Sequence, residues 1–191
     1  MSINKGAIWH TCPLMPINMV RLFFLFAFSF IFSSQVLAGG PKRFSSVMTE
    51  NGVLYFIEPM KMHTYDGCAS KKDMLFDITY LTNDDDSVSF TTTVITENIT
   101  KLDSVCIHMG EKTIKTNTEF IYCDPDGSRY VNRIRFYIKW TEWKELYEYP
   151  QPYIVDFGNN LYFAFKPKKW EKERKEIMQI INIIELNKTQ R

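Results

Sequence analysis

The sequence predicts an α+β domain: a single antiparallel β-sheet of about seven or eight strands in a meander, with a long C-terminal amphipathic helix packed on one face. Three observations support this. Several segments alternate apolar and polar residues, turn residues separate those segments, and one apolar stripe near the C-terminus has helical spacing. A β-sandwich or a barrel with the C-terminal helix outside is the alternative, because layered packing of such elements allows both arrangements.

The alternation is clearest over residues 129–140, where Ile134, Phe136 and Ile138 share one face and charged residues share the other. Residues 41–51 are polar and are expected to be poorly ordered, and residues 58–73 are expected to form a long loop. The other expected strands cover 53–57, 74–80, 87–95, 103–109, 112–123, 153–157 and 161–165.

Two helices are expected in the C-terminal part of the chain. A short one over 141–149 would have Thr141 as its N-cap and would end before Pro150. A long one would begin at Pro167, since proline is favoured in the first helical turn, and continue to about residue 186. Its apolar stripe is expected to pack on the sheet and consists of Ile177, Ile180, Ile181 and Ile184.

Residues 1–38 have the features of a leader. Its core, residues 19–38, places Arg21 before a run of eleven residues that is apolar apart from Ser29, and it ends on Ala38, which is the pattern of a secretory signal peptide. The run is shorter than the roughly twenty residues that cross a bilayer. Gly39 rather than cysteine follows Ala38, which argues against a lipoprotein. The sequence therefore predicts an exported protein, periplasmic or secreted and not integral to a membrane, with one α+β domain over 39–191.

The charge balance of that domain argues against nucleic acid as a partner. The leader contains two of the 23 basic residues (Lys5 and Arg21) and none of the 22 acidic ones, which leaves 21 basic against 22 acidic residues. A surface that binds nucleic acid or anionic lipid has a clear positive excess.

Three cysteines follow the leader, and an oxidising compartment would allow two of them to pair. Cys106 and Cys123 both fall in expected strands, so a cross-strand disulfide between them is the favoured pairing. Cys68 lies in an expected loop and could pair with either one. Three free thiols are the remaining possibility.

A basic row is the first candidate binding surface. Arg133, Arg135 and Lys139 share one face of the expected strand 129–140, where they could meet an acidic glycan or an acidic partner protein. The alternative is ion pairing with acidic residues of neighbouring strands, for which the candidates are Asp77, Glu97 and Glu119.

An aromatic segment is the second candidate. Exposed tryptophan and tyrosine rings stack on sugars or anchor protein partners, whereas buried ones pack a core. Both interpretations apply here, and the residues are Trp140, Trp143, Tyr147, Tyr149 and Tyr153.

The chain lacks the common catalytic and cofactor motifs, and it lacks the closely spaced Cys or His pairs of zinc sites. The predicted function is therefore an exported, cofactor-free binding domain of the cell envelope or extracellular space, with a protein or glycan ligand. One alternative is a small secreted hydrolase or transferase that uses His63 or His108. The other is a purely structural envelope protein.

Overall fold

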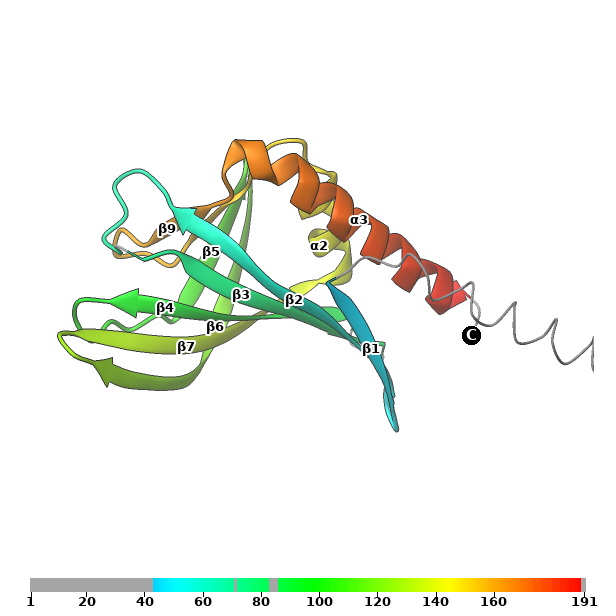
Figure 1. Ribbon diagram of the computed structural model, residues 1–191, viewed down its shortest axis with the longest axis horizontal. Coiled ribbons are helices and arrows are strands. Elements are labelled where there is room, and N and C mark those ends of the chain that lie inside the picture. The colour runs from blue at the N-terminus through cyan, green and yellow to red at the C-terminus, as the bar shows by residue number, and fades with distance from the viewer. Residues whose placement is uncertain (1–42, 71, 83–85, 190–191) are drawn as a thin grey trace, which may run out of the picture. The chain divides into compact units, whose positions relative to one another are not determined.

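The computed structural model shows an antiparallel β-barrel with one additional strand and two helices (Figure 1). It describes residues 43–70, 72–82 and 86–189; the leader lies outside these ranges. The elements are β1 (Phe44–Thr49), β2 (Gly52–Thr64), β3 (Met74–Leu81), β4 (Ser87–Thr96), β5 (Ser104–Met109), β6 (Lys112–Asp126), β7 (Arg129–Lys139), α2 (Trp140–Glu148), β8 (Ile154–Asp156), β9 (Tyr162–Ala164) and α3 (Pro167–Thr189).

The sheet is closed. Eight strands pair in the order β2-β3-β4-β7-β6-β5-β8-β9, and β9 returns to β2 through the pairs His63–Ala164 and Thr64–Phe163. The open sheet predicted from the sequence is therefore wrong, and the alternative of a barrel with a C-terminal helix is confirmed. Closure depends on the short hairpin β8–β9, which bridges β5 and β2 and was correctly expected as a hairpin.

Strand β2 is longer than the sequence pattern indicated. Residues 58–64 were expected to be loop, but β2 continues to Thr64 and pairs with both β3 and β9. Its register shifts between Ile57 and Met60, around Pro59, because proline cannot donate a ladder hydrogen bond and is accommodated at such a bulge.

Strand β1 lies outside the ring. It falls within residues 41–51, which were expected to be poorly ordered because that segment is polar. They nevertheless pair with β2 in continuous register from Phe44–Ile57 to Thr49–Gly52, across the turn that Asn51-Gly52 predicted. Backbone hydrogen bonding to β2 therefore forms this strand, although its side chains are mostly exposed.

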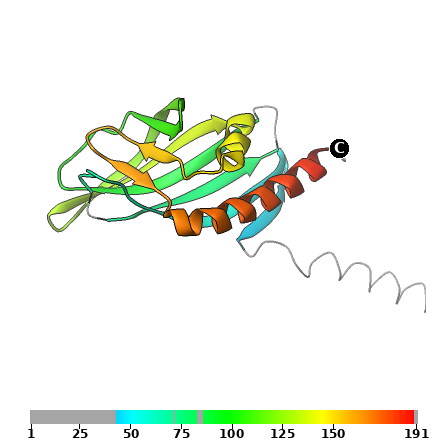
Figure 2. The ribbon, with the colours of Figure 1, turned by 90° about the horizontal axis from the view of Figure 1, so that it is seen from above.

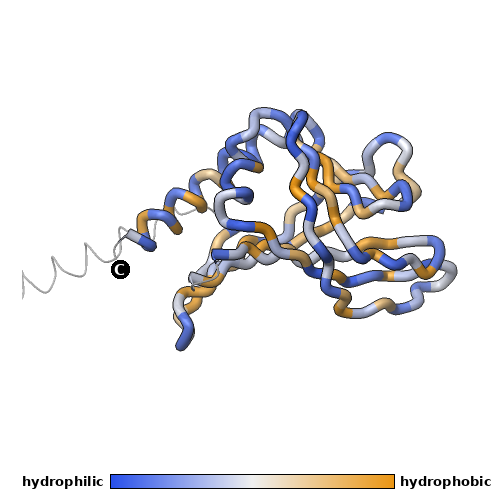
Figure 3. The backbone as a smooth tube through the Cα atoms, turned by 180° about the vertical axis from the view of Figure 1, so that it is seen from behind, coloured by the Kyte–Doolittle hydropathy of each residue, from blue (hydrophilic) through white to orange (hydrophobic). Residues whose placement is uncertain are grey.

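The inward faces of the strands and one side of each helix form one hydrophobic core. The four stripe isoleucines of α3 are all buried in it, as the spacing predicted. The Arg43–Glu173 ion pair of 2.7 Å joins the chain just before β1 to α3, and the two elements cross in the view of Figure 2. At the other end of α3, Asn187 donates a hydrogen bond to the hydroxyl of Tyr55 on β2 (3.2 Å). Along the strands, apolar and polar residues alternate in the colouring of Figure 3.

Helix α2 begins at Trp140, one residue before the expected range, and its N-cap lies two residues before the expected one. Its N-cap is Lys139, not Thr141, and the Glu142 carboxylate accepts a hydrogen bond from the Lys139 backbone N–H at 2.9 Å. This bond satisfies a backbone donor that would otherwise lack a helical partner.

The predicted Cys106–Cys123 disulfide is wrong. Cys106 on β5 lies opposite Lys115 of β6, eight residues before Cys123. At ~3.3 Å per residue this separates the two cysteines by roughly 26 Å along the strand, whereas bridged Cα atoms lie within about 7 Å. Cys68, Cys106 and Cys123 are all free.

Among the described helices, none combines the length and the apolar character needed to cross a membrane.

Candidate functional site

The predicted aromatic segment lies in the core. Trp140, Trp143, Tyr147 and Tyr153 are all buried, and Tyr149 is half-buried. The hydroxyls of Tyr147 and Tyr153 lie 3.1 Å apart, and burial raises the pKa of both groups. The four buried rings therefore do not form a surface site, whereas Tyr149 lines a groove together with His63 and His108.

The basic row lies on the outer face of β7, as the alternation predicted. Arg133 forms an ion pair with Asp77 of β3, with 2.5 Å between Nη2 and Oδ2, and donates a hydrogen bond from Nη1 to the Thr93 hydroxyl. This is one of the cross-strand pairings that the sequence left open. Lys139, at the end of β7, is exposed.

Arg135 differs from Arg133 in its partners. Its Nε donates a hydrogen bond to the Thr91 hydroxyl at 3.4 Å. Glu119 lies opposite it in the β6–β7 register but accepts a hydrogen bond from the Tyr137 hydroxyl. Within the described ranges no acidic side chain forms an ion pair with Arg135, so its two terminal nitrogens remain available to a ligand.

Arg135 lines a groove of about 540 Å³ on the outer face of the sheet, which we call the outer groove. All six neighbouring strands from β1 to β6 in the sheet order contribute to its lining, and the Arg133–Asp77 ion pair lies within it. Side chains that line it include Ser45, Phe56, Glu58, Ile121, Tyr122 and Arg135.

Two β-bulges border the outer groove. The register of β2 shifts between Ile57 and Met60, and that of β6 shifts between Phe120 and Tyr122. A bulge redirects side chains and bends its strand, and bulges are frequent beside functional sites. Here they accompany the exposure of three apolar side chains at the groove, those of Phe56, Ile121 and Tyr122.

The two histidines line a different groove, of about 650 Å³. Register pairs place His63, Ala164, Ile154 and His108 in one row across β2, β9, β8 and β5. His63 Nδ1 lies 3.1 Å from the carboxylate of Asp73. At the other end of the row, His108 Nε2 lies 3.6 Å from the Asp156 carboxylate, and its Nδ1 lies 3.0 Å from the Thr113 hydroxyl.

Beside this histidine groove, His108 lies between the Thr113 hydroxyl and the Asp156 carboxylate, but Thr113 does not line the groove. Both nitrogens of His108 face other partners, although Cys106 lies on the same strand and opposite Asp156. The Nε2 of His63 is buried without a hydrogen-bond partner. Within the described part of the chain, no hydrogen bond joins either histidine to a cysteine or serine; the hydroxyl group that contacts a histidine is that of Thr113.

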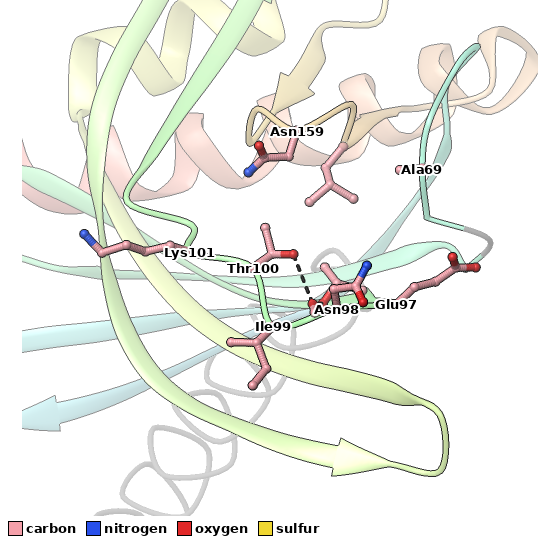
Figure 4. Close-up of a pocket in the computed structure, with 9 residues that line it drawn as sticks. Ala69, Glu97, Asn98, Ile99, Thr100, Lys101 and Asn159 are labelled. Atoms are coloured by element: carbon pink, nitrogen blue, oxygen red, sulfur yellow. Dashed lines mark hydrogen bonds between the residues drawn. The ribbon is translucent and has the colours of Figure 1, made fainter.

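A third pocket, of about 460 Å³, lies among the loop that follows β4, the β8–β9 turn and Ala69 (Figure 4). The Thr100 hydroxyl donates a hydrogen bond to the Asn98 carbonyl at 3.0 Å. The side chains of Glu97 and Lys101 point away from each other in Figure 4, so the charged groups of this pocket do not converge on one ligand position.

The described residues contain no group of three or more His, Cys, Asp or Glu side chains placed to hold a metal ion. No protein-family model matches the chain, and no curated protein or solved structure matches it either.

The outer groove is thus the best candidate site, and sequence reasoning found only part of it. Arg133 and Arg135 were identified, but Phe56, Ile121 and Tyr122 were not. One signal was present: the consecutive apolar residues 120–122 interrupt the alternation of their strand, as an exposed bulge does.

Proposed function

We propose that this protein is an exported, cofactor-free binding domain whose outer groove holds an extended segment of a partner protein and pairs one carboxylate of that segment with Arg135. The observation that carries this proposal is the position of Arg135, half-buried, without an ion pair in the described ranges, and in one groove with Phe56 and Tyr122.

The chemistry of Arg135 favours a carboxylate ligand. A guanidinium presents its N–H donors in a planar fork that matches the two carboxylate oxygens. Partial burial strengthens such a pair, because fewer water molecules screen it. Phe56 and Tyr122 would add apolar contact beside it, and aromatic residues with arginine dominate the energetics of many protein interfaces.

The lining also favours a polypeptide over an acidic glycan. Ile121 and Pro59 add aliphatic surface, which side chains of a peptide cover well. Glu58 on β2 is three strand spacings away from Arg135 on β7, or about 14 Å at ~4.8 Å per spacing. An extended segment spans that distance with about four residues, so we expect an acidic residue at one end and a basic residue at the other.

Export rests on the leader. If the signal peptide is removed after Ala38, N-terminal sequencing of the protein recovered from the periplasm or medium will begin at Gly39. Protein that begins upstream of residue 19 in that fraction, or is found only inside the cell, contradicts export.

The binding proposal is tested by selecting peptides from a displayed random library against the purified protein. We expect enriched peptides with an acidic residue and at least one apolar residue. Substitution Arg135→Ala should weaken the selected peptides at least about tenfold, the loss expected for a charge-assisted hydrogen bond.

Lys139→Ala is the matched control, because it removes a positive charge from the same strand outside the lining of the outer groove. It should leave peptide affinity within about twofold, the change expected of an exposed charge. Peptides that bind Arg135→Ala as tightly as the native protein contradict the proposal, and so does a library that yields no enrichment. Enrichment from an acidic glycan array in place of peptides would also overturn it.

A further inference from the structure

Strand β1 presents an open edge. It pairs with β2 on one side, and no other described strand pairs with it. Its side chains are exposed, including Val47 at 53% and Met48 at 82%. An unpaired strand edge carries a row of backbone donors and acceptors, which another strand can bind.

The sheet has a second open edge, and comparison with it is informative. Strand β6 pairs with β5 only up to Asn117, so residues 119–126 have β7 on one side and no described strand on the other. That edge carries a register shift, a proline at Pro125 and three acidic residues. Bulges, prolines and charges are the devices by which proteins prevent edge pairing.

Strand β1 carries none of these devices. Its six residues contain no proline and no charge, and they pair with β2 without a register shift. A regular, uncharged strand that is exposed on both faces is suited to accept another strand, whereas the β6 edge is protected against one.

We infer that β1 pairs antiparallel with β1 of a second copy of this chain, which joins the two sheets in a two-fold symmetric dimer. Two-fold pairing places a residue opposite its own copy. With Ser46 at that centre, Phe44 lies opposite Met48 of the second copy, an aromatic–sulfur contact that covers the most exposed side chain of the strand.

Charge supports a second copy as the occupant. Glu50 follows the strand, and Arg43, which precedes it, keeps 34% of its side chain exposed beside its ion pair with Glu173. Antiparallel pairing brings the start of one strand to the end of the other, so residues of opposite charge gather at both ends of the pair. The uncharged strand between them places no like charges in opposition.

This inference does not depend on the proposed binding function. A two-fold axis normal to the joined sheet keeps equivalent faces on the same side, so the dimer would present its two outer grooves in one direction.

The test uses opposite charges at the centre of the proposed pair. Ser46 is exposed, so Ser46→Lys and Ser46→Glu should fold normally, and matching thermal unfolding curves check this. Each variant alone places like charges opposite each other and should lower the dimer association constant at least about tenfold. An equimolar mixture of the two variants pairs opposite charges and should restore the dimer, as measured by sedimentation velocity.

Ser128→Lys and Ser128→Glu are the controls, because they make the same changes at the exposed β6–β7 turn and should dimerise like the native protein. A native protein that stays monomeric up to about 1 mM overturns the inference, since even weak interfaces are populated there. Ser46 variants that dimerise as well as the native protein, or mixtures that remain monomeric, overturn it as well.

Discussion

Replacing Ile180 with alanine tests whether α3 is an integral part of the core. Ile180 has 0% exposure and lies at the centre of the buried stripe. Truncating a fully buried isoleucine removes its transfer free energy and leaves a cavity, which together cost about 2–5 kcal/mol. Alanine favours the helix more than isoleucine does, so a loss of stability reports packing rather than helix propensity.

Leu186→Ala is the matched control. Leu186 lies on the same helix but is 63% exposed, and surface substitutions of this kind change stability by less than about 0.5 kcal/mol. With a urea m-value near 2 kcal/mol/M, Ile180→Ala should lower the unfolding midpoint by about 1–2.5 M, and Leu186→Ala should leave it almost unchanged. Equilibrium urea unfolding followed by circular dichroism measures both.

The two variants also define the result that would refute the reasoning. Equal midpoints for Ile180→Ala and the native protein would mean that α3 does not dock on the barrel. Ile180→Asp makes the test more severe, because it buries an unpaired charge. We expect that variant to lose several kcal/mol, enough to unfold a domain of ordinary stability.

Two further predictions concern titration and thiols. Burial acts to raise the pKa of Asp73, but the hydrogen bond from Lys61 and the charge of His63 outweigh it, so the pKa lies below its ordinary value. The stability that this shift contributes is complete above the ordinary pKa of Asp73 and is lost as the pH falls through its pKa in the folded protein. The unfolding midpoint of Asp73→Asn should therefore decline less steeply with falling pH than that of the native protein. Parallel declines for the two proteins would contradict this. Alkylation of unreduced, denatured protein should modify Cys68, Cys106 and Cys123, and mass spectrometry that finds only one modified thiol among them would show that a disulfide had formed.

The sequence alone determined most of the elements. Alternation located the strands near 74–80, 87–95 and 129–140, and the isoleucine spacing located α3. These patterns are reliable because an element that buries one face carries apolar residues at a spacing that its own sequence shows. For the same reason the sequence placed Arg133 and Arg135 correctly on the outer face of β7.

The tertiary structure decided what depends on distant partners. Alternation within a strand does not indicate which strand pairs with it. The closure of the barrel through β2 and β9, and the separation of Cys106 from Cys123, therefore follow only from the register of the paired strands. Strand β1 forms by hydrogen bonding to β2 rather than by burial, so its composition concealed it. Arg133 and Arg135 both line the outer groove, but Arg133 is paired with Asp77, whereas Arg135 has no ion pair in the described ranges. The register places Asp77 in the same cross-strand row as Arg135, through Thr91, yet its carboxylate pairs with Arg133. The three-dimensional side-chain arrangement therefore decides which of two arginines that look alike in the sequence is paired.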